Sequence, residues 1–266
     1  MADYKRMSKA ASGLLACLMA LLAPAARAEP AVVGLARAYL GPQSTLDAIQ
    51  SIHYVGSIDR LDPDRADKVP EHVSLDLTLA KPLRQHQVVR GTKVSRTTVL
   101  DGYDAWDLLK DNADPRKARL TWLQPAEIKS LRADTWENLY YYRVPAGGAV
   151  EDKGPATVDG VDCERVAFTH GANAVYERYF DRDTGRLVMT VRGTETFRES
   201  GEIRVDGVRF PKRIVSSHKT PSGKDEVTTV TFDSIVLNEP LNPDLFAAPS
   251  PLAPKAVPAA GAVPKK

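Results

Sequence analysis

Most of the chain shows an alternation of apolar and polar residues, which is the pattern of a β-strand with one buried side and one solvent-facing side. The clearest example is residues 73–79, where polar residues separate four aliphatic ones: Val73, Leu75, Leu77 and Leu79. Similar runs predict strands over residues 53–60, 72–80, 84–91, 95–100, 103–110, 156–160, 163–169, 174–181, 186–192, 194–205, 208–218 and 224–237. The pattern therefore predicts a protein built mainly from strands.

Short turn sequences connect many of these predicted strands. Asp-Gly pairs occur at 101–102, 159–160 and 206–207, and such pairs accept the positive φ angles that tight hairpins need. Asp183-Thr184-Gly185 fits a longer hairpin loop with its glycine in the left-handed conformation. Hairpins between consecutive strands produce an antiparallel meander, so we expect the centre of the protein to be antiparallel and all-β.

Two segments break this β pattern and favour helices. In residues 31–52 apolar residues recur at near-helical spacing, and Gly41-Pro42 divides the segment in two. A further helix is predicted to begin at Pro125, because proline suits the first helical position and the acidic Glu127 favours the helix dipole in the first turn. Its apolar side is expected to contain Ile128, Leu131, Trp136 and Leu139.

A sheet of this size must cover its apolar face. It can close into a barrel, stack on another sheet, or curl around helices or a ligand. We expect a mainly β (α+β) fold, in which the two helical segments are candidates for a partial lid over a curved sheet. Residues 29–249 are expected to form this fold as one domain.

The N-terminus has the features of an export signal. Three basic residues precede the apolar stretch 10–24, and Ala26-Arg27-Ala28 then matches the small-x-small site of a signal peptidase. The stretch is shorter than the roughly 20 apolar residues of a transmembrane helix, so residues 1–28 are predicted to be a cleaved signal peptide that directs the chain to the periplasm. The lipobox-like Leu14-Leu15-Ala16-Cys17 leaves a lipid anchor at Cys17 as the less favoured alternative, because the apolar run continues beyond it.

Composition narrows the class of protein further. The chain has 266 residues, of which 43% are hydrophobic and 26% charged, as is ordinary for a soluble globular protein. Its formal net charge of +2 argues against a nucleic-acid binder, whose basic patch normally shows in the total. Residues 250–266 are rich in proline and alanine, which predicts a disordered tail.

Candidate catalytic chemistry is sparse. After signal cleavage Cys163 is the remaining cysteine, and it is expected to be a buried apolar filler or else a reactive thiol. The pair Cys163 and His170 lacks an evident orienting group for nucleophilic catalysis. Asp101, Asp104 and Asp107 crowd one hairpin without the spacing of a calcium loop. We therefore predict a protein that is not an enzyme, with no cofactor and no metal.

Four segments, in this order along the chain, resemble the periplasmic lipoprotein-carrier (LolA-like) family of outer-membrane lipoprotein-sorting proteins. They are Leu79-Ala80-Lys81-Pro82-Leu83-Arg84, Val99-Leu100-Asp101-Gly102-Tyr103-Asp104-Ala105-Trp106, Tyr179-Phe180-Asp181-Arg182-Asp183-Thr184-Gly185-Arg186-Leu187, and residues 232–249 with Asn238 and Phe246. The resemblance spans roughly residues 31–249. It implies an incomplete antiparallel barrel, capped by helices, that encloses an apolar cavity.

The expected function is that of a periplasmic, monomeric, non-enzymatic carrier of lipid or lipoprotein acyl chains, with envelope proteins that hand over or accept the cargo. The alternative is a cell-envelope sensor or scaffold module that binds a protein partner through the same sheet. The residues expected to bind the ligand are Val73, Leu75, Leu77, Leu79, Lys81, Trp106, Trp122, Trp136 and Tyr140. The aliphatic residues would line the cavity or the adjoining core, the aromatic ones would lie near its mouth or in the core, and Lys81 would meet a lipid head group.

Overall fold

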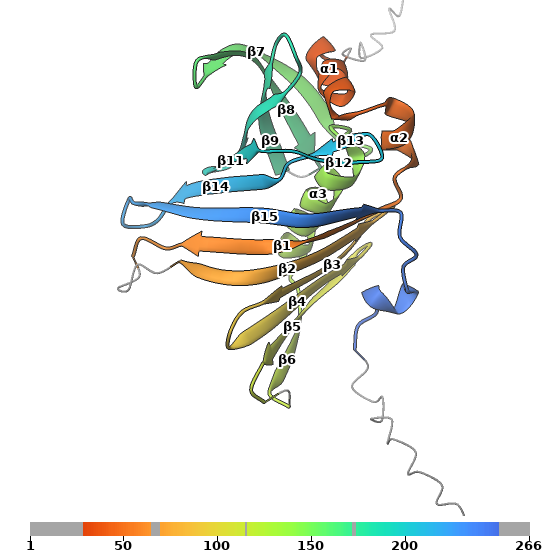
Figure 1. Cartoon of the computed structure of the whole chain (residues 1–266), viewed down its shortest axis with the longest axis vertical. Coiled ribbons are helices and arrows are strands. Elements are labelled where there is room, and N and C mark those ends of the chain that lie inside the picture. Colours follow the sequence, from red (N-terminus) through yellow and green to blue (C-terminus); the bar gives the residue numbers. More distant parts are fainter. Residues whose placement is uncertain (1–28, 65–69, 115, 172–173, 250–266) are drawn as a thin grey trace, which may run out of the picture.

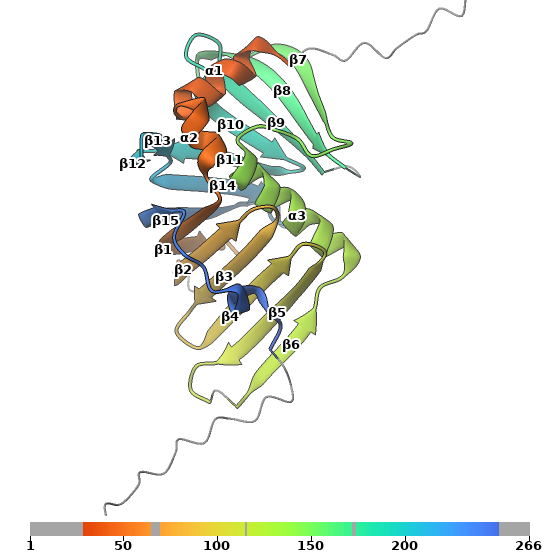
Figure 2. The same ribbon diagram turned by 90° about the vertical axis from the view of Figure 1, so that its right-hand side faces the viewer.

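The computed structural model of the chain describes residues 29–64, 70–114, 116–171 and 174–249. The predicted signal peptide, the alternative anchor at Cys17 and the predicted tail 250–266 lie outside the described residues and stay predictions. In the described ranges, one antiparallel sheet contains 13 strands in the order β6-β5-β4-β3-β2-β1-β15-β14-β11-β10-β9-β8-β7 (Figure 1). The predicted open antiparallel fold is confirmed: the sheet curls strongly, and its two outer strands do not meet (Figure 2).

The elements follow the sequence closely. The strands of the main sheet are β1 Ser51–Leu61, β2 Glu71–Ala80, β3 Arg84–Arg90, β4 Val94–Asp101, β5 Asp104–Asp111, β6 Ala118–Trp122, β7 Ala149–Val158, β8 Val161–His170, β9 Ala174–Asp181, β10 Leu187–Arg192, β11 Glu195–Ser200, β14 Arg213–Lys219 and β15 Asp225–Leu237. A separate hairpin consists of β12 Ile203–Val205 and β13 Val208–Phe210. The helices are α1 Ala31–Leu40, α2 Gln43–Ala48, α3 Pro125–Tyr140 and the 3₁₀ turn η1 Pro243–Phe246. Among these described residues, no helix is both long and apolar enough to cross a membrane.

The last strand of the chain joins the two halves of the sheet. β15 pairs with β1 on one side, where Tyr54 lies opposite Ile235, and with β14 on the other. Strands β1–β6 therefore extend one half of the sheet, and β7–β11 extend the other. The side chain of Asn238 fixes this junction, because its Oδ1 accepts the backbone N–H of Gln50 at 2.6 Å.

Helix α3 crosses the concave side and packs on both halves (Figure 2). Ile128, Leu131 and Trp136 pack against a buried cluster that includes Leu100 of β4. Further along the helix, Leu139 lies in the central core with Leu75 and Leu79 of β2, and Ala133 packs with Phe168 and Phe180 of the other half. The helix begins at Pro125, as predicted, and a capping box between Gln124 and Glu127, which was not predicted, holds its start.

A second buried cluster lies on the opposite, convex face of the sheet. Phe246 of η1 is 2% exposed and packs with Ala80, Val99 and Trp106. Val99 and Leu100 are neighbours on β4, and successive side chains of a strand point to opposite faces. Because Leu100 packs under α3, the Phe246 cluster must lie on the other side of the sheet.

Most predicted strands are confirmed within one or two residues. The predicted strand 156–160 is too short, because β7 begins at Ala149, and three further differences have physical causes. The predicted strand 194–205 is wrong: the chain breaks after β11, at Gly201 with φ of 66°, and then forms β12. The predicted strand 208–218 is wrong in the same way, because Pro211 has no N–H for a ladder and separates β13 from β14. Strand β6 was not predicted, since all of its residues are exposed and no face is selected to be apolar.

Two of the three predicted Asp-Gly turns are confirmed. Asp159-Gly160 and Asp206-Gly207 have φ values of 52° and 78°, and 50° and 80°, as a two-residue hairpin requires. The third is shifted by one residue, because Asp101 pairs with Asp104 and leaves Gly102 first in the turn, with φ of 63°. Two features require glycine at position 185. Its φ of 73° is one that other residues rarely adopt, and a Cβ there would lie 2.4 Å from the backbone of Leu35 in α1.

Candidate functional site

A cavity of about 370 Å³ opens on the concave side of the sheet, beside the second half of α3. Its size is within the range of about 300–1,000 Å³ that small-molecule sites occupy. It is lined by Leu40, Tyr54, Leu77, Asp134, Glu137, Asn138, Tyr141, Tyr142, Tyr176, Arg178, Leu187, Thr190, Arg192, Phe197, Glu199, Arg209, Phe210, Pro211, Ile214, Val230 and Phe232. These residues come from both halves of the sheet, so the cavity exists only where the sheet curls.

One wall of this concave cavity is apolar. Tyr54 of β1 lies at the centre of that wall, with its ring centroid 4.9 Å from that of Phe232 and 6.1 Å from that of Phe210. Leu77 of β2 faces the same side, because it pairs with Tyr54 across the strands. An apolar wall of this kind favours the hydrocarbon part of a ligand.

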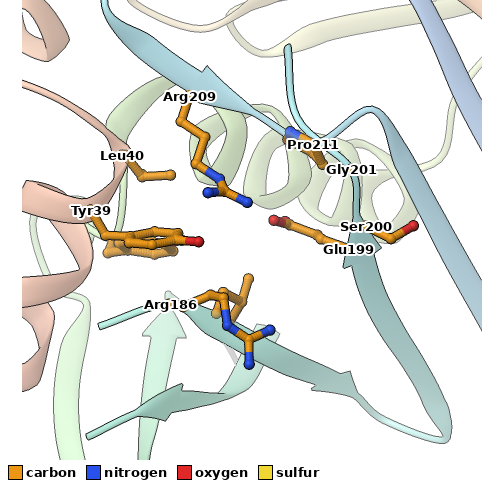
Figure 3. Close-up of a pocket in the computed structure, with 10 residues that line it drawn as sticks. Tyr39, Leu40, Arg186, Glu199, Ser200, Gly201, Arg209 and Pro211 are labelled. Atoms are coloured by element: carbon orange, nitrogen blue, oxygen red, sulfur yellow. The ribbon is translucent and has the colours of Figure 1, made fainter. Parts of the chain in front are cut away.

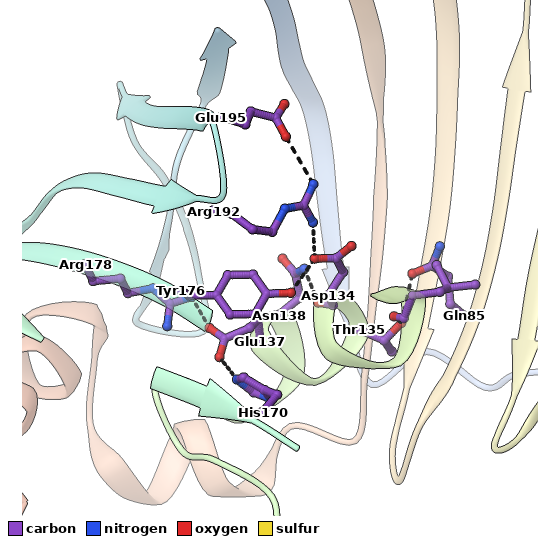
Figure 4. A network of polar contacts seen from close by, with 11 residues as sticks. Gln85, Asp134, Thr135, Glu137, Asn138, His170, Tyr176, Arg178, Arg192 and Glu195 are labelled. Atoms are coloured by element: carbon purple, nitrogen blue, oxygen red, sulfur yellow. Dashed lines mark hydrogen bonds and ion pairs between the residues drawn. The ribbon is translucent and has the colours of Figure 1, made fainter. Parts of the chain in front are cut away.

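The facing wall is polar and is anchored on α3 (Figure 4). Asp134 accepts a hydrogen bond of 2.6 Å from the hydroxyl of Tyr176 and forms an ion pair with Arg192. Arg192 also contacts Glu195 at 3.1 Å. The helix is thereby tied to strands β9, β10 and β11 of the second half of the sheet.

One turn along the same helix, a second carboxylate is fully buried. Glu137 contacts both the guanidinium of Arg178 and Nε2 of His170, and its side chain is 6% exposed. Burial alone would raise the pKa of Glu137, but Arg178 and His170 lower it below its usual range. Glu137 therefore carries a charge at neutral pH and balances that of Arg178.

The guanidinium of Arg178 is surrounded by aromatic rings. Its central carbon lies 5.0 Å from the ring centroids of Tyr142 and Phe168 and 5.6 Å from that of Tyr176. Such contacts stabilise a cation that is shielded from water. Within the described part of the chain its Nε and Nη1 have no hydrogen-bond partner, so the rings and Glu137 hold the charge in place.

A smaller cavity of about 260 Å³ adjoins the first between α1, β11 and β13 (Figure 3). Its polar groups include Tyr39, Arg186, Glu199 and Arg209, and the guanidinium of Arg209 lies 4.5 Å over the Tyr39 ring. The two cavities share lining residues: Leu40, Tyr142, Leu187, Glu199, Arg209 and Pro211. They are therefore neighbours: the larger has an apolar wall and the smaller is lined by charged side chains.

The structure separates the predicted aliphatic residues of β2. Leu77 lines the larger cavity, while Leu75 and Leu79 are at most 4% exposed and belong to the adjoining central core. Val73 lies on the same face, half-buried and nearer the far end of the strand. A ligand-binding role for these four residues stays a prediction.

Three further predicted residues lie together on the other side of α3. The ring of Tyr140 stacks on Trp136 at 3.8 Å, and Lys81 places its Nζ 5.3 Å from the centroid of the same ring. Partial burial lowers the pKa of Lys81, although Asp47 opposes that shift. None of the three lines the cavities just described.

The two remaining tryptophans lie on the convex face. Trp106 is 5% exposed in the cluster with Phe246, and Trp122 pairs opposite it on β6 with 55% of its surface exposed. Trp106 and Trp122 were expected near the mouth of a concave cavity, but they lie on the opposite face of the sheet. The reason is that Ala105 and Trp106 are consecutive apolar residues, and Ala105 takes the concave face.

Cys163 and His170, the pair considered as a nucleophile and a base, do not lie together. Cys163 and His170 are seven positions apart on the regular strand β8, so their side chains point to opposite faces. Cys163 is buried with Val158 and Val188, and burial raises the pKa of its thiol. In the described ranges, no group of three or more histidine, cysteine or acidic side chains is arranged to hold a metal ion.

The sequence analysis did not predict the polar wall of the larger cavity, although the sequence of β9 indicates a buried charge. Tyr176, Arg178 and Phe180 alternate on one face of that strand and are all buried. A lone arginine in an otherwise aromatic face requires a buried counterion, but nothing in the local sequence says that Glu137 supplies it.

Comparison with known proteins rests on structure, because the sequence matches no protein-family model and no curated protein. The fold is similar to a LolA superfamily protein from Nitrosomonas europaea, with a TM-score of 0.57 and 14% identity over 82% of this chain and 96% of that one. A DUF1329 family protein from Desulfovibrio piger gives a TM-score of 0.54 and 12% identity over 82% and 96%. An outer membrane lipoprotein-sorting protein domain from Vibrio parahaemolyticus, described as putative, gives 0.53 and 9% over 80% and 95%.

These likenesses define the class of fold. The similarity extends over 80–82% of this chain and 95–96% of those three structures. The chain has a LolA-like fold, as the four sequence segments predicted.

Proposed function

We propose that the chain is a non-enzymatic periplasmic carrier that shields the acyl chain of a lipid or lipoprotein in the larger concave cavity. The observation that carries this proposal is the cavity itself, in which Tyr54, Phe210 and Phe232 form an apolar wall opposite the charged residues of α3 and β9. The predicted signal peptide supports the periplasmic location, and the LolA-like fold supports a binding role.

The physical need for such a carrier is large. Burial of each CH₂ group is worth about 0.8 kcal/mol, so a 14-carbon chain in water costs roughly 10 kcal/mol. A chain of that kind cannot cross an aqueous compartment without a shield. A cavity of about 370 Å³ fits one acyl chain better than two.

The test is titration of the purified protein with N-phenylnaphthylamine, an uncharged dye that fluoresces in apolar sites. We expect saturable binding by the wild type and its loss in Leu77→Glu, which places a charge on the cavity wall. The matched control is Leu120→Glu, the same change at a residue of β6 that is 37% exposed and outside the cavity. Circular dichroism must show that all three proteins are folded.

A folded wild type that does not bind the dye would overturn the carrier proposal. In that event the alternative, an envelope sensor or scaffold that binds a protein partner, takes its place. Equal loss in the two variants would show that the dye reports on charge in general and would also contradict the assigned cavity.

A further inference from the structure

The smaller cavity contains a carboxylate that the protein leaves without a partner. Glu199 lies on β11 two residues after Phe197, so both face the concave side, and its carboxylate points into the cavity (Figure 3). Among the described residues it forms no hydrogen bond and no ion pair. Glu199 is exposed to solvent, but protein atoms around its carboxyl raise the pKa, although Arg178 and Arg209 oppose this.

Two guanidinium groups border the same space. Arg209 uses Nη1 for an ion pair of 2.7 Å with Glu202 and lies flat on Tyr39, which fixes its position. The guanidinium of Arg186 has neither a hydrogen bond nor an ion pair within the described ranges. The cavity is therefore lined by one carboxylate and two guanidinium groups, and the guanidinium of Arg186 extends away from the other two groups (Figure 3).

Charge complementarity restricts what can occupy this cavity. A purely anionic head group would meet the arginines but would place its charge beside the carboxylate of Glu199. A purely cationic group would pair with Glu199 and be repelled by Arg186 and Arg209. A head group that carries both signs satisfies all three side chains.

We propose that the smaller cavity is a head-group subsite for a single-chain amphiphile whose head carries a phosphate and a primary amine. The phosphate oxygens accept hydrogen bonds from Arg186 and Arg209, and the ammonium donates to Glu199. The acyl chain continues into the larger cavity, which has room for one chain. This inference rests on the proposed carrier function, because the acyl chain must lie in the adjoining larger cavity.

The experiment measures displacement of N-phenylnaphthylamine by three monoacyl glycerophospholipids of equal chain length. Their heads are ethanolamine (amine and phosphate), choline (a quaternary amine without N–H donors) and glycerol (phosphate alone). We expect the ethanolamine lipid to displace the dye at a concentration about tenfold lower than the other two, the size of one charge-assisted hydrogen bond.

Three variants assign the preference to residues. Glu199→Gln should abolish the preference for ethanolamine, measured as the ratio of the three displacement concentrations within that variant. Arg186→Gln should weaken all three lipids relative to the dye. Glu177→Gln, the same change on a residue of β9 whose neighbours in the strand, Tyr176 and Arg178, take the opposite face, should have no effect.

The outcomes separate the two proposals. Dye binding with equal displacement by the three lipids overturns the head-group subsite and leaves the acyl-chain cavity standing. A preference for ethanolamine that survives in Glu199→Gln also overturns the subsite. Absence of dye binding by the folded wild type overturns both proposals at once.

Discussion

The buried pair of Glu137 and Arg178 offers a quantitative test of how α3 is held. Glu137→Gln keeps the shape of the side chain but leaves the guanidinium of Arg178 buried, 7% exposed, without its counterion. Removal of one partner of a buried ion pair costs about 3–5 kcal/mol of unfolding free energy. For a domain of this size that corresponds to a fall in Tm of roughly 6–20 °C.

The sign of the pH dependence follows from the lowered pKa of Glu137. A carboxyl group whose pKa is lower in the folded state than its ordinary value of 4.5 stabilises the fold above that value. The contribution is lost as the pH falls through the folded pKa, so the difference between wild type and Glu137→Gln should shrink below pH 4.5.

The assay is urea denaturation followed by circular dichroism at pH 7 and at pH values below 4.5. Glu177→Gln is the matched control, because its side chain lies on the other face of β9 from Arg178. A loss smaller than about 1 kcal/mol at pH 7 would refute the reasoning. It would mean that the aromatic rings alone hold the charge of Arg178.

Further expectations concern single features of the fold and of its ends. Gly185→Ala should destabilise the protein by about 1–3 kcal/mol, measured by urea denaturation, because φ is 73° and a Cβ would meet the backbone of Leu35. Phe246→Ala should cost about 3–5 kcal/mol in the same assay, since it empties the convex cluster; no change would show that the C-terminal segment is not needed there. N-terminal sequencing of the exported protein should begin at Glu29, and a lipidated cysteine would contradict this. Truncation after Pro249 should leave Tm unchanged, and a fall of several degrees would show that the tail docks.

The strands and turns could be predicted because their signals are local. Residues 73–79 alternate over one strand, and Asp159-Gly160 sets a hairpin by its own φ angles. The same local signals cannot say which face of a strand is concave where both faces are apolar. Val99 and Leu100 are both fully buried, one on each side of β4, because η1 covers the second face from more than a hundred residues away.

The polar wall of the site was beyond local prediction for a related reason. Glu137 comes from α3, Arg178 from β9 and Glu199 from β11, and the curl of the sheet alone brings them around one space. The position of Leu77 could be predicted, because the alternation along β2 places it on the same face as Leu75 and Leu79 of the core. The sequence places Arg186 in a hairpin, but it does not show that Arg186 lines the smaller cavity together with Glu199 and Arg209.

The pairing of the last strand with the first has a consequence for the order in which the protein can fold. Asn238 accepts a hydrogen bond from Gln50, 188 residues earlier, and β15 is the strand through which the two halves of the sheet are joined. During the N-to-C export that residues 1–28 predict, neither half can close around the cavity until residue 238 has emerged. Contacts of such high sequence separation form slowly, so a chain that emerges from its N-terminus exposes its apolar concave strands until the last strand is added.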